Sequence, residues 1–67
     1  MLIKIGDVRY NWRNVETYKA EGDTKIVVRT LSEIRTFKFK DKITRDNALA
    51  SLDEAILNNG SCDIKVD

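Results

Sequence analysis

Hydrophobic and polar residues alternate along much of the N-terminal half of the chain, which is the pattern of strands with one buried face. Residues 2–5 form the first such run, and Gly6-Asp7 after them is a two-residue hairpin signal. The alternation continues through residues 8–20, with an interruption at Arg13-Asn14, where asparagine favours a bend or a bulge. Residues 2–20 are therefore expected to contain two strands, the second of which is bent.

Two further strands are expected at residues 24–30 and 34–40. The first contains three consecutive β-branched residues at 26–28, which favour extended backbone. In the second, Phe37 and Phe39 alternate with polar residues, so both phenylalanines are expected to face the core.

After this strand the hydrophobic period changes to that of an α-helix. The apolar stripe consists of Ala48, Leu49, Leu52, Ala55 and Ile56. Thr44 occupies the position expected for the N-cap, and Ile43 before it can pack on Ala48 as a weak hydrophobic staple. Residues 58–60 end the helix, with Gly60 able to adopt the left-handed conformation. Residues 62–67 alternate again, which predicts a short edge strand.

The predicted architecture is α+β, in a single domain spanning residues 1–67. Short connections favour pairing of the first four strands as an antiparallel four-stranded meander. One C-terminal amphipathic helix then covers one face of the sheet, and the short terminal strand joins an edge. The other face is left to water or to a partner. The predicted core comprises Ile3, Ile5, Val8, Tyr10, Trp12, Val15, Ile26, Val28, Phe37, Phe39, Leu49, Leu52, Ile56 and Ile64.

Composition argues against catalysis. The chain has no histidine, so a Cys–His or Ser–His arrangement cannot form within it. Cys62 is the only cysteine, which rules out an internal disulfide and a structural zinc site, and we expect it to act as a small hydrophobic residue. The glycines (Gly6, Gly22 and Gly60) are isolated turn residues and form no phosphate-binding loop. We therefore expect no enzyme, and no metal, cofactor or small-molecule substrate.

Charge is unevenly distributed, although the net charge is only +1. Residues 1–45 contain eleven Lys or Arg and six Asp or Glu, a balance of +5. Residues 46–67 contain one lysine and five acidic residues, a balance of −4. Partners respond to such local fields more than to the total.

Basic residues predominate at the strand positions expected to point away from the core. They include Lys4, Arg9, Lys25, Arg29, Lys38 and Lys40. Such a face could bind nucleic-acid phosphates, although only Tyr18 could supply a stacking platform there, and only if the bend shifts the register. The alternative is a solvated face whose charges discourage edge pairing between molecules.

Trp12 is the only tryptophan and is followed by Arg13. If the alternation holds, Trp12 belongs to the core together with Val8 and Tyr10, which small cores favour because they need large apolar side chains. If residues 11–14 instead form a turn, Trp12 projects beside an arginine, as interface anchors often do.

Five features of the chain together resemble a recurring pattern: the run Val8-x-Tyr10-Asn11-Trp12-x-Asn14-Val15, the following glycine turn, residues 25–28, Phe37-x-Phe39 and the closing helix. It is similar to small uncharacterised bacterial and prophage proteins built as a β-meander ending in one helix. The resemblance implies this fold and a bacterial or phage context, and it brings no activity or site residue. A single cysteine and the lack of any long apolar run favour a cytoplasmic location without a membrane segment.

These features favour a small non-enzymatic protein-interaction module that binds a protein partner or a copy of itself. Nucleic-acid binding through a basic sheet face is the alternative. The candidate interaction surface comprises Arg9, Trp12, Arg13, Lys25, Arg29, Lys38 and Lys40.

Overall fold

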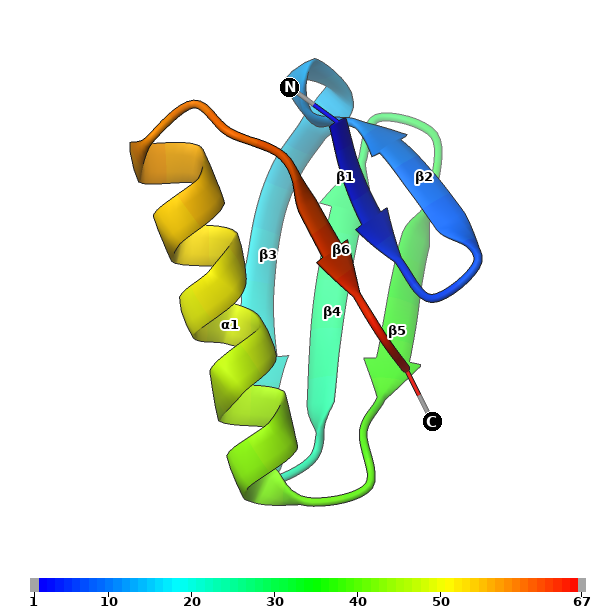
Figure 1. Ribbon diagram of the computed structural model, residues 1–67. Coiled ribbons are helices and arrows are strands. Elements are labelled where there is room, and N and C mark those ends of the chain that lie inside the picture. The colour runs from blue at the N-terminus through cyan, green and yellow to red at the C-terminus, as the bar shows by residue number, and fades with distance from the viewer. Residues whose placement is uncertain (1, 67) are drawn as a thin grey trace.

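The computed structural model describes residues 2–66. In chain order the elements are β1 (Leu2–Ile5), β2 (Val8–Asn11), the 3₁₀-helix η1 (Trp12–Asn14), β3 (Val15–Glu21), β4 (Lys25–Thr30), β5 (Ile34–Lys38), α1 (Lys42–Leu57) and β6 (Cys62–Ile64). The α+β class predicted from the sequence is confirmed. The strands form two three-stranded sheets, β2–β1–β6 and β3–β4–β5, and α1 runs along one side of them (Figure 1).

The predicted single four-stranded meander is wrong, because the chain leaves the first sheet after β2. There η1 turns the backbone, and the side-chain oxygen of Asn11 accepts a hydrogen bond from the Arg13 N–H (3.3 Å). β3 then pairs antiparallel with β4 and not with β2. The interruption predicted at Arg13-Asn14 is therefore where the chain passes from one sheet to the other.

β6 occupies an edge of the first sheet, as predicted, although it is shorter than the predicted run of residues 62–67, the last of which lies outside the described residues. It runs parallel to β1, with Ile3 beside Cys62 and Ile5 beside Ile64. A parallel pair needs a long crossover connection, and here every element from β2 to α1 lies between the two strands in the chain. β1 is consequently the central strand of this sheet.

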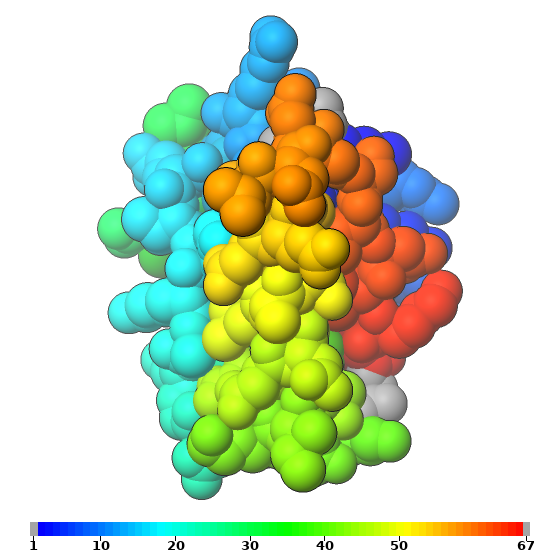
Figure 2. All heavy atoms as spheres, turned by 60° about the vertical axis from the view of Figure 1, so that its left-hand side comes forward, coloured from blue at the N-terminus to red at the C-terminus, as the bar shows by residue number. Residues whose placement is uncertain are grey.

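The hydrophobic core lies between the two sheets and α1. Its buried residues are Ile3, Ile5, Tyr10, Ile26, Val28, Phe37, Phe39, Ala48, Leu52, Ala55 and Ile64. The other predicted core residues, namely Val8, Trp12, Val15, Leu49 and Ile56, are only half-buried. Ala48 and Ala55 were not predicted to be core residues. Figure 2 shows α1 seated between β3 and β6, and small side chains on its buried face suit this close packing.

The ends of α1 differ from the prediction. The N-cap is Asp41 and not Thr44, and its carboxylate accepts a hydrogen bond from the Thr44 N–H (2.7 Å). Ile43 is 74% exposed, so it forms no staple with the core. At the other end Asn59, and not Gly60, takes the left-handed conformation, with a φ of 54°. Asparagine tolerates this region better than most residues because its short polar side chain can bond locally.

Arg45 is the buried charged residue of the described chain, at 4% exposure. Its Nη1 donates hydrogen bonds to the main-chain carbonyls of Gly22 and Lys25, both at 3.0 Å. Its Nε donates to the Asp46 carboxylate at 2.8 Å, which supplies a countercharge. One side chain therefore fixes the start of α1 to the turn between β3 and β4.

Replacing Arg45 with methionine is expected to lower the free energy of unfolding by about 2 kcal/mol, because the two carbonyls lose their donor. The measurement is urea denaturation at neutral pH. Lys42→Met is the matched control, since Lys42 also pairs with Asp46 (3.0 Å) but is exposed. Lys42→Met should lower the free energy of unfolding by less than about 0.5 kcal/mol. Equal losses in the two variants would contradict the role given to Arg45.

Candidate binding surface

One face of the sheet β3–β4–β5 is not covered by any other described element. The sheet β2–β1–β6 and α1 both pack on its opposite side (Figure 1). We call the uncovered side the outer face. Its side chains are Thr17, Lys19 and Glu21 from β3, Lys25, Val27 and Arg29 from β4, and Ile34, Thr36 and Lys38 from β5. All are exposed except Val27, which is half-buried.

The outer face is strongly basic. At its ladder positions it carries Lys19, Lys25, Arg29 and Lys38 against one acidic residue, Glu21, while Glu16 of the bulge lies beside Arg29 and Ile34 at one end. Within residues 2–66, none of these four basic side chains takes part in an ion pair. Their charges are therefore free to act on a partner.

Two of these cations lie directly opposite each other. The N–H of Phe39 donates to the Thr24 carbonyl (2.8 Å), which makes these residues a hydrogen-bonded pair of the antiparallel ladder. Pairs alternate in type, so the neighbouring pair, Lys25 and Lys38, is non-hydrogen-bonded, with Cα atoms about 4.5 Å apart. Like charges in this position repel each other. An anion bound beside them would relieve that repulsion.

The part of the outer face farthest from this lysine pair is partly apolar. Ile34 is 59% exposed and lies opposite Arg29, and Val27 is the next outward residue along β4. Together with parts of β3 they line a shallow hollow of ≈ 500 Å³. Leu31, in the adjoining turn, is 82% exposed. The outer face therefore offers aliphatic side chains next to cations.

The structure gathers only part of the candidate surface predicted from the sequence. Lys25, Arg29 and Lys38 share the outer face. Arg9 belongs to the other sheet, opposite Lys4, and Arg13 lies in η1. Lys40 lies beyond the end of β5, because the strand stops two residues before the predicted boundary of residue 40.

Lys19 belongs to the outer face, but sequence reasoning missed it. Alternation counted from the inward Val15 places Lys19 on the inner side. A β-bulge between Val15 and Thr17 shifts the register by one residue and reverses the faces after it. Asn14 signalled an irregularity here, but not its effect on the residues that follow.

None of the five aromatic side chains, all of which lie in the described part of the chain, takes a position on the ladder of the outer face. Trp12 is half-buried, with its ring centroid 6.4 Å from that of Tyr10 and 5.6 Å from that of Tyr18. Tyr18 is directed toward α1, where its hydroxyl donates to the Asp53 carboxylate (2.5 Å). Trp12 is therefore neither a fully buried core residue nor a projecting anchor.

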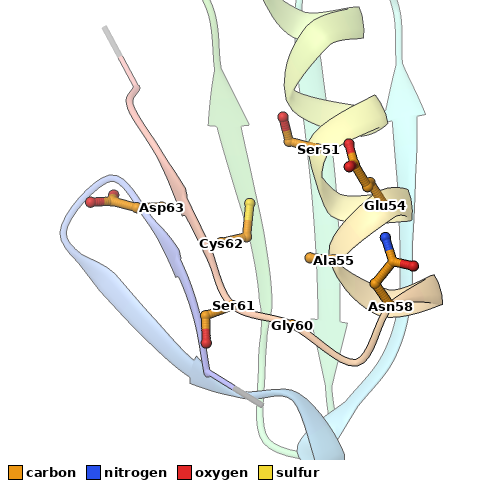
Figure 3. Close-up of a pocket in the computed structure, with 8 residues that line it drawn as sticks. All are labelled: Ser51, Glu54, Ala55, Asn58, Gly60, Ser61, Cys62 and Asp63. Atoms are coloured by element: carbon orange, nitrogen blue, oxygen red, sulfur yellow. The ribbon is translucent and has the colours of Figure 1, made fainter.

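A second hollow, of ≈ 380 Å³, lies between the C-terminal half of α1 and β6 (Figure 3). Cys62 directs its thiol toward α1, whereas Asp63 points away from the helix. Burial, and then the charge of Asp63, raise the pKa of the Cys62 thiol. The thiol is therefore held in its protonated form, which is the less nucleophilic one.

In the part of the chain that the structure describes, no group of three or more His, Cys, Asp or Glu side chains could hold a metal ion. No helix there is long and apolar enough to span a bilayer. Comparisons with known protein families, curated proteins and solved structures return no match. The chemistry of the outer face is therefore the basis for assigning a function.

The two tyrosines make stability depend on pH in the alkaline range. The hydrogen bond to Asp53 raises the pKa of Tyr18 to about 12, and burial raises the pKa of Tyr10 above 10.0. In the unfolded chain both ionise near pH 10. Because the folded state favours the protonated forms, this contribution to stability is present below pH 10 and is lost as the pH rises toward about 12. Phenolate absorbance near pH 10 should be small in the folded chain and large in urea; equal signals would contradict this prediction.

Substitution of each tyrosine by phenylalanine should separate the contributions of the two hydroxyls to the free energy of unfolding. Tyr18→Phe removes a bond to a carboxylate at a partly exposed site and is expected to cost about 1 kcal/mol of unfolding free energy. The Tyr10 hydroxyl is buried without a partner in residues 2–66, so Tyr10→Phe should cost nothing or stabilise the protein. Urea denaturation at neutral pH measures both. A greater loss from Tyr10→Phe would reverse this assignment.

Proposed function

We propose that this chain is a non-enzymatic protein-interaction module whose outer face binds an acidic surface of a partner protein. The observation that carries the proposal is the set of four basic side chains without ion pairs beside exposed aliphatic residues. In keeping with the single free cysteine, we place its action in a reducing compartment such as the cytoplasm.

A protein partner fits this mixture of chemistry. Carboxylates can pair with Lys25 and Lys38, whose mutual repulsion then decreases. Aliphatic side chains of the partner can cover Ile34 and Val27, and burial of apolar area supplies binding energy that charges at an interface rim alone do not. The complementary charges also speed association and orient the partner.

The outer face does not suit association with the same face of a second copy. Such a contact would bring two sets of four cations together, against only two glutamates. The acidic stretch of residues 46–67 on a second copy could reach the face, but that contact is head-to-tail and need not close into a finite oligomer. A different protein is therefore the preferred partner.

Nucleic-acid binding is the second candidate, because the same four cations could neutralise phosphates. Two features weigh against it. The outer-face ladder carries no aromatic side chain on which bases could stack. A face three strands wide also does not match the major groove of duplex DNA, which admits a helix or a two-stranded ribbon.

The test is charge reversal at the opposed lysines. In a pull-down from nuclease-treated bacterial lysate, the wild-type chain is expected to retain a discrete protein. The Lys25→Glu/Lys38→Glu double variant should lose it, because the pair then repels the acidic partner. The affinity of the purified pair should also fall as salt is raised.

Arg9→Glu/Arg13→Glu is the matched control. It makes the same change in net charge at exposed positions away from the outer face and should keep the partner. Equal loss in both double variants would show that only net charge matters and would overturn the proposal. Material that disappears after nuclease treatment would instead favour the nucleic-acid alternative.

A further inference from the structure

β5 is an open edge of the basic sheet. The order β3–β4–β5 gives it one neighbour, and no hydrogen bond from another described residue reaches the main chain of Ile34, Thr36 or Lys38 on its other side. All three residues are exposed. The edge lies on the side of the sheet away from α1 (Figure 1).

The ladder determines which backbone groups of this edge are free. Thr36 pairs with Val27, and Lys38 with Lys25, at non-hydrogen-bonded positions of the β4–β5 ladder. Their N–H and C=O groups, like those of Ile34, therefore point away from β4. Arg35 is at a hydrogen-bonded position, and its backbone groups point toward β4. The residues with free backbone groups are thus the ones whose side chains lie on the outer face.

We propose that an extended acidic segment of the partner protein adds to β5 as a fourth, antiparallel strand. This inference rests on the proposed function and specifies how the partner binds. Each of the three free positions can exchange two hydrogen bonds with the incoming strand. Such strand addition gives affinity through the backbone and specificity through alternate side chains.

The three outer-face positions of β5 define the sequence that fits. Opposite Lys38 an acidic residue is favoured, because Lys38 has another lysine on its β4 side and an open position on the other. Opposite Thr36 a second threonine fits, and opposite Ile34, which is 59% exposed, an aliphatic residue does. Read from its N-terminus, an antiparallel segment therefore follows the pattern acidic, any, Thr, any, aliphatic.

Pairing of β5 with β5 of a second copy satisfies these rules less well. A two-fold axis at Thr36 would align Lys38 with Ile34 of the other copy. It would also place two basic outer faces side by side on the same surface of one six-stranded sheet, where their charges repel. An acidic partner segment removes both disadvantages.

The probe is the blocked peptide acetyl-Glu-Val-Thr-Val-Ile-amide, titrated into the full chain and followed by amide hydrogen exchange. Exchange at Ile34, Thr36 and Lys38 is expected to slow, because their N–H groups gain acceptors. Exchange at Arg35 and Phe37 should change little, since their N–H groups already face β4. The same peptide with lysine in place of glutamate is the control and should bind more weakly.

Thr36→Pro tests the edge directly. Proline removes the N–H at a position where it faces solvent, which edge strands tolerate, and should weaken peptide binding by at least about fivefold. Thr36→Val keeps the N–H and a β-branched side chain, so it should bind like the wild-type chain. If Thr36→Pro does not fold, the exchange pattern of the wild-type chain decides alone.

The outcomes separate the two proposals. Binding that is lost in Lys25→Glu/Lys38→Glu but unchanged in Thr36→Pro, without slower exchange at Thr36, would overturn strand addition and leave the acid-binding face intact. Equal binding of the glutamate and lysine peptides would overturn the charge basis of the proposed function. If, without peptide, amide exchange at Thr36 becomes slower as the protein concentration is raised, a second copy occupies the edge. That result would also overturn the inference.

Discussion

The contact of Arg45 with the turn between β3 and β4 fixes α1 to the sheet β3–β4–β5. Its guanidinium reaches the carbonyls of Gly22 and Lys25 from the first turns of α1. No disulfide or metal cluster in the described residues shares this task. Because the helix is fixed to the inner side of β3–β4–β5, the opposite side of that sheet stays open. The arrangement that stabilises the molecule thus also determines which face of this sheet stays exposed.

The placement of β6 has a similar effect on the other sheet. By pairing parallel with β1 it makes β1 a central strand, and it lies between β1 and α1 (Figure 1). The acidic segment that begins at residue 46, which includes most of α1 and all of β6, is therefore on the far side of the core from the basic outer face. Part of the charge difference along the sequence is therefore kept between the two sides of the molecule, although Lys4 and Arg9 lie in the sheet β2–β1–β6 and not on the outer face.

Local patterns in the sequence predicted the elements well. Alternation identified the strands around Ile26 and Phe37, and the period of the apolar stripe identified α1. The division into two sheets could not be read in the same way. Alternation continues on both sides of η1, and nothing in the pattern shows that the strands before and after it have different neighbours.

The candidate surface was predicted in part, for related reasons. Lys25, Arg29 and Lys38 lie on regular strands, where a period of two fixes the face. Lys19 follows a bulge, so its face depends on pairing between strands and not on its own neighbours in sequence. Arg45 was missed because an arginine in the first turns of a helix has the pattern of a surface residue. Its burial depends on the carbonyls of Gly22 and Lys25, which lie 23 and 20 positions earlier in the chain.

The opposed pair Lys25 and Lys38 has a further consequence for how the molecule responds to its surroundings. Dissolved salt weakens the repulsion between the two ammonium groups and therefore favours the folded chain at this point. The same salt would weaken the attraction of the acidic partner proposed above. Ionic strength thus acts in opposite directions on the fold and on the complex. In dilute buffer, where few ions screen the lysine pair, the carboxylates of the proposed acidic partner would take over that screening, so binding to the outer face would also stabilise the sheet.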